Sequence, residues 1–230
     1  YLDSANSSQK PKAVIDRLSN FYETEFSNVG RSVHTLAVKA TNRFEATRDI
    51  VKRYINAHHR EEIIFTKGAT ESINLVASTY GEKYIKEGDE ILITELEHHS
   101  NYVTWQFLRK NKGAIIKFAP INKNGEVEID EIKKLINDKT KIIAVTHLSN
   151  VTGAIMPIKK IVEIAAKKNI PVLVDGTQGA PHLEIDMQDL GCDFYAISCH
   201  KMYGPNGLGI LYAKKKWLEV LPPYQGGGGM

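Results

Sequence analysis

Cysteine is scarce in this chain of 230 residues, which contains only Cys192 and Cys199. The two cysteines form no CxxC pair and belong to no group with metal-ligand spacing, so the sequence predicts neither a disulfide framework nor a metal site. Long apolar runs are also missing. None approaches the roughly 20 residues that cross a bilayer, and no signal peptide is visible behind Tyr1. No membrane association is therefore expected.

An excess of charge of one sign is missing as well. The 30 Lys and Arg residues nearly balance 27 Asp and Glu residues, for a formal net charge of +3. No basic block and no basic stripe interleaved with aromatic residues occurs, so nucleic acid is not an expected partner. The chain is 42% hydrophobic and 25% charged, which is ordinary for a globular protein with one large core or two small ones.

The pattern of apolar residues changes along the chain. Residues 1–8 form a polar stretch, and Pro11 suits the first turn of a helix whose apolar face would be Val14, Ile15, Leu18, Phe21 and Tyr22. Residues 28–35 break this pattern, and a second helix is predicted over 36–58. Beyond residue 62, short apolar runs alternate with helical patterns. Strands are predicted over 63–66, 91–94, 115–119, 142–146, 172–174, 194–197 and 208–212, and helices over 70–80, 102–111, 129–136, 158–168 and 217–221.

This alternation predicts an α/β fold with a mostly parallel seven-stranded sheet and helices on both of its faces. Ligands of such sheets bind outside the carboxyl ends of the strands. Lys201 lies between the last two expected strands, in Ser198-Cys199-His200-Lys201. It is either a loop lysine that reaches water or a lysine that attacks a carbonyl to form a Schiff base.

Polar residues also follow the other expected strands, and most of them allow two interpretations. Thr70 can cap the helix that follows it or give its hydroxyl to a phosphate at the helix N-terminus. His98 can stack on an aromatic ring or lie on the surface without a role. Asn150 can bind a ligand or form a turn. Asp175 follows a fully apolar strand, so its carboxylate needs a cationic partner, a metal ion or another structural contact.

One cofactor would use all these side chains together. In pyridoxal 5′-phosphate (PLP) enzymes, an aspartate holds the protonated ring nitrogen beside a lysine that binds the aldehyde. Asp175 and Lys201 fit these two positions, Gln178 fits the ring oxygen, and His98 fits the face of the ring. Thr70, Ser198 and His200 supply donors for the phosphate. We therefore predict a PLP site.

The sequence resembles the class V aminotransferase-like branch of fold-type I PLP enzymes, and within it the group II (SufS-type) cysteine desulfurases and selenocysteine lyases. The resemblance covers nearly the whole chain. It is carried by the segments NVGRSVHTL, EIIFTKGATESINLVA, GDEILITELEHHSNYVTWQ, THLSNVTGAIMPI, VLVDGTQGAPH and LGCDFYAISCHKMYGPNGLGILY.

The resemblance implies a role for each matching residue. Lys201 would form the Schiff base with PLP and move protons, and His98 would stack on the ring and assist catalysis. Asp175 would hold the pyridine nitrogen, and Gln178 would contact the ring hydroxyl. Thr70, Ser198, His200 and the amide of Ala69 would bind the phosphate, and Asn150 would lie near the substrate carboxylate.

The sequence also departs from the family pattern. Ser4 and Asn6 are altered positions in the first loop, Gly30 stands where a histidine is common, and Cys199 stands where glycine or alanine is usual. The chain ends at Met230 in a glycine-rich turn that lies in mid-protein in the family. We therefore expect an N-terminal helical segment (residues 1–60) and a PLP-binding large domain (residues 61–230). The family's C-terminal small domain, with its sulfur-accepting cysteine and substrate-binding arginine, would be absent.

The implied activity is PLP-dependent conversion of L-cysteine to L-alanine with sulfur transfer for iron–sulfur cluster assembly. The alternatives are a truncated, non-catalytic domain or binding module, and another class V activity such as selenocysteine lyase. The implied partners are L-cysteine or selenocysteine, a sulfur-acceptor protein and a second copy in a homodimer. The implied location is the cytoplasm, or an organellar matrix if a targeting peptide has been removed.

Overall fold

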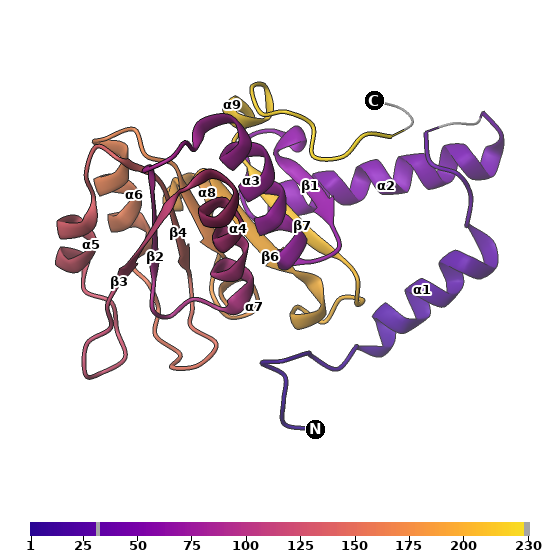
Figure 1. Cartoon of the computed structure of the whole chain (residues 1–230). Helices are drawn as coiled ribbons and strands as arrows, with labels where there is room; N and C mark the ends of the chain where they lie inside the picture. The colour runs from indigo at the N-terminus through magenta and orange to yellow at the C-terminus, as the bar shows by residue number, and fades with distance from the viewer. Residues whose placement is uncertain (31–32, 228–230) are drawn as a thin grey trace.

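A computed structural model describes residues 1–30 and 33–227 of the chain (Figure 1). Arg31 and Ser32, in the expected break at residues 28–35, lie outside the described residues, as do residues 228–230 at the glycine-rich end. No helix in the described part is long and apolar enough to cross a membrane.

The described residues build one seven-stranded sheet in the order β1-β7-β6-β5-β4-β2-β3. Strand β7 runs antiparallel to β1 and β6, and the remaining neighbours are parallel. The predicted mostly parallel sheet is confirmed. The strands are β1 (Ile63–Thr66), β2 (Glu90–Thr94), β3 (Ile115–Ala119), β4 (Thr140–Thr146), β5 (Val172–Asp175), β6 (Phe194–Ser198) and β7 (Gly209–Ala213).

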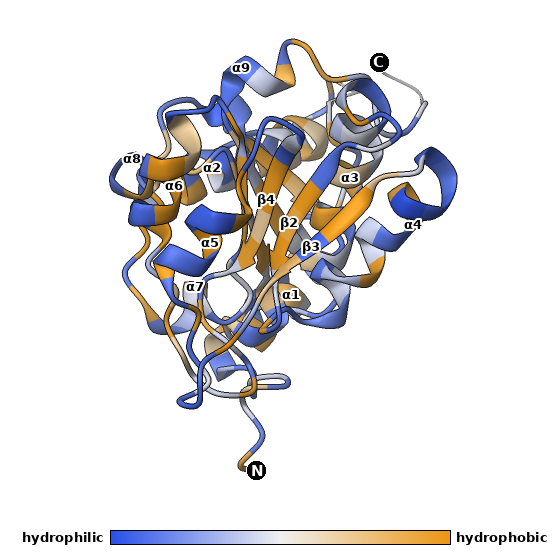
Figure 2. Cartoon of the chain, turned by 60° about the vertical axis from the view of Figure 1, so that its left-hand side comes forward, coloured by the Kyte–Doolittle hydropathy of each residue, from blue (hydrophilic) through white to orange (hydrophobic). Residues whose placement is uncertain are grey.

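Helices cover both faces of the sheet, as the sequence predicts (Figures 1 and 2). On one face, α3 and α4 pack over the sheet around Ile73 and Trp105, and on the other α6 and α8 pack around Ile161 and Met187. The α-helices are α1 (Lys12–Thr24), α2 (Thr35–Tyr54), α3 (Ala69–Tyr84), α4 (Val103–Lys112), α5 (Ile129–Leu135), α6 (Ile158–Ala166), α7 (Gly179–His182), α8 (Met187–Leu190) and α9 (Lys215–Leu218). Short 3-10 turns occur at η1 (Arg60–Glu62), η2 (His99–Asn101) and η3 (Cys199–Lys201).

Successive residues of the central strands enter two different cores. In β4, Ile143 and Val145 belong to the core under α6, whereas Ile142 and Ala144 belong to the core under α3. All four side chains are 0% exposed. Each buried aliphatic side chain of the size of valine or isoleucine contributes about 1.5–3 kcal/mol, so both layers of helices are held by the same strands. This explains why β4 has four consecutive apolar residues, 142–145, and does not alternate between apolar and polar residues there.

The predicted end of the second helix is wrong. The helix was expected to reach residue 58, but α2 ends at Tyr54, and Asn56 has a left-handed φ of 51°. Ile55 and Ala57 are buried in the core beside the sheet. Packing of these two side chains therefore bends the chain out of the helix earlier than its local pattern indicates.

The N-terminal helix α1 lies away from the sheet (Figure 1). Its predicted apolar face exists, but no residue of α1 is buried. Ile15 is 48% exposed, Leu18 is 40% exposed and Tyr22 is 68% exposed. The described residues of this chain therefore leave the apolar face of α1 uncovered.

A close backbone approach at the end of β1 requires glycine at position 209. Gly209 pairs with Thr66 across the β1–β7 ladder, and a Cβ atom on Gly209 would lie 2.4 Å from the Cα atom of Gly68. The contact is with backbone, which cannot rotate away. Only glycine lets the turn after β1 lie so close to β7.

We expect Gly209→Ala to lower the free energy of unfolding by about 1–3 kcal/mol, because the added methyl forces the two backbones apart. Thermal unfolding followed by circular dichroism measures the loss. Gly226→Ala is the matched control, since a Cβ there meets nothing within 4 Å. Equal melting temperatures for both variants would contradict the backbone contact.

Candidate active site

A cavity of about 220 Å³ lies at the carboxyl ends of the strands. Residues from five strand ends meet there, because β1 and the parallel strands β2, β4, β5 and β6 all finish at this edge. All nine residues singled out from the sequence line it. They are Ala69, Thr70, His98, Asn150, Asp175, Gln178, Ser198, His200 and Lys201.

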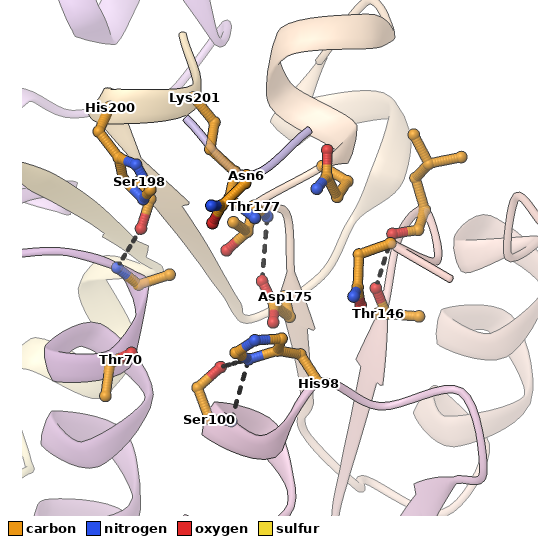
Figure 3. A pocket seen from close by; sticks show the side chains of 14 residues that line it. Asn6, Thr70, His98, Ser100, Thr146, Asp175, Thr177, Ser198, His200 and Lys201 are labelled. Atoms are coloured by element: carbon orange, nitrogen blue, oxygen red, sulfur yellow. Dashed lines mark hydrogen bonds between the residues drawn. The ribbon is translucent and has the colours of Figure 1, made fainter. Parts of the chain in front are cut away.

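Asp175 is the last residue of β5 and lies at the centre of the site (Figure 3). It is only 3% exposed. Among the described residues, its carboxylate accepts one hydrogen bond, from Thr177 N to Oδ1 at 3.0 Å. A buried carboxylate with so few donors is costly unless a cation faces it. The site is therefore suited to a ligand that brings a protonated nitrogen to Asp175.

Lys201 ends the short turn η3 and is half-buried. Its amine makes no hydrogen bond or ion pair with any residue that the structure describes. Burial lowers the pKa of Lys201, while the negative charges of Asp175 and Asp3 oppose that shift. A lowered pKa places more of the lysine in the free-amine form that attacks a carbonyl.

His98 is the N-cap residue directly before the turn η2 and faces the cavity opposite Lys201 (Figure 3). Its Nδ1 atom accepts a hydrogen bond from Ser100 N at 3.2 Å, and Ser100 Oγ lies 2.8 Å from the same atom. A backbone N–H can only donate, so Nδ1 is unprotonated and the neutral ring carries its hydrogen on Nε2. Ser100 thus fixes both the orientation of the ring and its tautomer.

The first turn of α3 forms one end of the cavity. The position of Thr70 corrects one of the two sequence interpretations: Gly68 is the N-cap of α3, and Thr70 is the second residue of the helix. Ala69 N donates to Ser198 Oγ at 2.8 Å, which joins the helix to the end of β6. The Thr70 and Ser198 hydroxyls and the positive end of the helix dipole form a set that suits an anion such as phosphate.

The N-terminal segment, residues 3–8, lies against this site although it is far away in sequence. Gln178 Nε2 donates to Ala5 O at 2.7 Å, and Ser8 N donates to His200 O at 3.0 Å. Asn6 lines the cavity beside Lys201 and Thr177 (Figure 3). Burial and the charges of Lys201 and Lys10 lower the pKa of His200, which favours its neutral form.

Five further residues line the cavity that the sequence did not assign to the cofactor: Asn6, Ser100, Thr146, Leu148 and Thr177. The strand-end rule could have found Thr146 and Thr177, since they end or closely follow β4 and β5. Asn6 could be noted from the sequence only as an altered position of the first loop. Its place beside Lys201 depends on the path of residues 1–8.

Neither cysteine has the character of a reactive thiolate. Burial raises the pKa of Cys192 to about 12 and that of Cys199 to about 11. Cys199 is the first residue of η3, the turn that ends in Lys201, but it does not line the cavity. Both thiols stay protonated near neutral pH, as expected for cysteines that serve packing.

The fold and the site together define a class. A mostly parallel α/β sheet that presents a lysine, a buried aspartate and a helix N-terminus at one edge is the large domain of fold-type I PLP-dependent transferases. The family model "Aminotransferase class-V" matches residues 1–230. The chain belongs to the class V aminotransferase family.

Several cysteine desulfurases are similar to the chain over its whole length. The chain is 52% identical over 230 residues to a probable cysteine desulfurase of Halalkalibacterium halodurans and 50% identical to a cysteine desulfurase of Yersinia pseudotuberculosis. It covers 57% of the length of each. Among solved structures, the cysteine desulfurase CsdA of Escherichia coli matches with a TM-score of 0.92 at 40% identity, and the chain covers 58% of it. A cysteine desulfurase of Thermococcus onnurineus matches with a TM-score of 0.95 at 36% identity, with 57% covered. All of this chain is covered in each match.

The charge of Asp175 predicts a pH effect on Lys201. Asp175→Asn removes a negative charge that raises the pKa of the lysine, so burial is less opposed and the pKa falls further. The free amine then persists to lower pH, and the midpoint of Lys201 acylation should move to lower pH. Mass spectrometry of the Lys201 peptide after labelling at a series of pH values measures this. Asp189→Asn, at an exposed residue of α8 that does not line the cavity, is the control and should leave the midpoint in place; a rise in the Asp175→Asn midpoint would contradict the assignment.

Proposed function

We propose that this chain is the PLP-binding part of a cysteine desulfurase, which converts L-cysteine to L-alanine and passes the sulfur to a thiol. One observation carries the proposal: the uncommitted amine of Lys201 and the buried carboxylate of Asp175 face the same cavity as the N-terminus of α3. The names of the similar proteins support the choice of cysteine as the substrate. Because the chain spans 57% of its curated relatives, the activity is proposed for a protein that includes it.

The chain supplies a matching group for each part of PLP. Asp175 would hold the protonated ring nitrogen, since its carboxylate is only 3% exposed and accepts a single hydrogen bond from the described residues. His98 would lie on the face of the ring, with Gln178 at the ring hydroxyl. Thr70, Ser198 and His200 would bind the phosphate at the helix N-terminus. When bound, PLP supplies an electron sink for the bonds of the substrate's α-carbon.

The residues of the chain would then move protons and orient the substrate. Lys201, with its lowered pKa, is suited to attack the aldehyde and afterwards to carry a proton to and from the substrate carbon. His98 presents Nε2–H to the cavity and can exchange that proton. Asn150 lines the cavity on the loop after β4, where its amide would orient the substrate carboxylate.

Sulfur transfer requires a second group. A thiolate attacks the sulfur of cysteine, a sulfur–sulfur bond forms, and the carbon–sulfur bond breaks to leave alanine after protonation. The raised pKa values of Cys192 and Cys199 make both unsuited to this attack. The accepting thiol is therefore proposed to lie outside residues 1–230, either in the same protein or on a sulfur-acceptor partner.

A homodimer is part of the proposal. An isolated helix of the length of α1 is marginal in water. Its apolar side chains Ile15, Leu18 and Tyr22 are exposed, and α2 adds Ile50 at 56% and Tyr54 at 59% exposure. Exposed apolar faces on two adjacent helices support contact with a second copy.

Lys201→Ala tests the cofactor assignment. Addition of PLP to the wild-type chain should produce a new absorbance band at the edge of the visible range, and Lys201→Ala should abolish it because no amine reaches the aldehyde. Lys168→Ala, which changes an exposed lysine beyond the end of α6 that does not line the cavity, should keep the band. Absence of the band from the wild-type chain under saturating PLP would overturn the cofactor assignment.

The same substitution, made in a protein that includes the accepting cysteine, tests the substrate. Alanine formed from L-cysteine, measured with a reducing thiol as sulfur acceptor, should exceed that of Lys201→Ala by at least about 10²-fold in a protein that includes the accepting cysteine. Selenocysteine as an alternative substrate distinguishes a desulfurase from a selenocysteine lyase. Turnover restricted to selenocysteine would favour the lyase.

A further inference from the structure

Glu97 is a carboxyl group that the proposed chemistry does not use. It lies between the end of β2 and the turn η2, directly before His98, and it does not line the cavity. Glu97 is half-buried, and burial raises the pKa of its carboxyl group to about 8 although its hydrogen bonds oppose that shift. A carboxyl group partly withdrawn from water beside a cavity residue needs a structural explanation.

Three hydrogen bonds from three elements converge on Glu97. Thr94 Oγ1 at the end of β2 lies 2.6 Å from Oε1, and Thr146 N at the end of β4 donates to Oε1 at 2.9 Å. Asn101 Nδ2, in η2, donates to Oε2 at 2.6 Å. The carboxyl group thus joins η2 to the ends of two strands of the sheet.

The orientation of Asn101 is fixed from its other side. Trp105 Nε1 donates to Asn101 Oδ1 at 3.1 Å, and both residues are 0% exposed. The amide nitrogen of Asn101 must therefore point to Glu97, because the amide oxygen already faces a donor. Only one orientation of the Asn101 amide therefore satisfies both of its hydrogen bonds.

This network determines where the turn that carries His98 can lie. Ser100 sets the orientation of the His98 ring within η2, but nothing in that contact ties η2 to the sheet. The bonds of Glu97 to Thr146 N and Asn101 Nδ2 make that connection, next to the strand that ends in Asp175. The distance between His98 and Asp175 therefore depends on the Glu97 carboxyl group.

We propose that Glu97 is a positioning residue that holds His98 over the cavity by joining the turn η2 to the carboxyl end of β4. The proposal rests on the proposed function in one respect: the ligand under His98 is taken to be PLP. Glu97 itself touches neither the ligand nor the substrate.

Glutamine cannot replace Glu97 in this network. Its amide has one accepting oxygen, whereas the two sides of the carboxyl group face Thr146 N–H and Asn101 Nδ2–H. In either orientation the NH₂ group meets a donor. Glu97→Gln therefore keeps the size of the side chain and breaks at least one of the bonds that tie η2 to the sheet.

The test compares Glu97→Gln with Glu95→Gln in the full chain. Glu95 lies in the same segment between β2 and η2 and is exposed. It accepts a hydrogen bond from Ile121 N at 3.0 Å, which a glutamine oxygen can also accept. We expect Glu97→Gln to weaken PLP binding roughly tenfold and to reduce the visible circular dichroism per bound PLP, because the ring loses a fixed neighbour. Glu95→Gln should match the wild type in both measurements.

A second measurement needs no cofactor. In the chain with labelled histidines, the ring signal of His98, assigned by its loss in His98→Ala, should shift or broaden in Glu97→Gln and stay unchanged in Glu95→Gln. The signals of His58 and His59, far from η2, are internal controls. Unchanged PLP affinity, dichroism and His98 signal in a folded Glu97→Gln variant would overturn the proposal.

The two measurements distinguish a failure of the proposed function from a failure of the Glu97 proposal. If the wild-type chain binds no PLP, the proposed function fails, while the His98 signal still decides the role of Glu97. If Glu97→Gln does not fold, Thr94→Val removes one of the three hydrogen bonds to the carboxyl group, together with the bond that Leu96 N donates to Thr94 Oγ1 at 3.1 Å. It should give a smaller change of the same kind, and no change would overturn the proposal.

Discussion

Parallel pairing of the central strands is the constraint on which the site depends. Because β2, β4, β5 and β6 run in the same direction, each brings the residues that follow it to one edge of the sheet. Together with the segment after β1, which ends at the same edge, five chain segments that are distant in sequence thus meet around one cavity. The helices on both faces exclude water from the strands, so the last residue of β5, Asp175, is buried while its carboxylate still faces the cavity. The chemistry of the site follows from that placement.

The edge of the sheet alone does not complete the site. The N-terminal segment returns to it and makes hydrogen bonds with Gln178 and with the backbone of His200. Asp3, in the same segment, opposes the effect of burial on the pKa of Lys201. On the opposite side, the Glu97 network ties the His98 turn to β4. Contacts that are distant in sequence therefore fix the positions of the groups that the strand ends supply.

The sequence predicted the strands well because each is a short apolar run between turn residues. It predicted the helix boundaries less well: α2 ends at Tyr54, before the expected residue 58, because Ile55 and Ala57 are drawn into the core. The nine candidate residues were chosen from the ends of predicted strands, and all nine line one cavity. The strand-end rule could not assign Glu97, whose importance depends on Thr146 and Asn101, and a sequence shows no such hydrogen bond.

By itself, the sequence determined the class of fold and predicted the edge of the sheet at which the candidate site lies, together with its lysine and aspartate. These follow from local periodicity and from the residue types at strand ends, which are written in short stretches of chain. Only the tertiary structure decided that Asp175 is buried with a single hydrogen bond from the described residues, that Gly68 rather than Thr70 caps α3, and that both cysteines are poor thiolates. Those properties depend on burial and on neighbours from distant segments, which packing alone brings together.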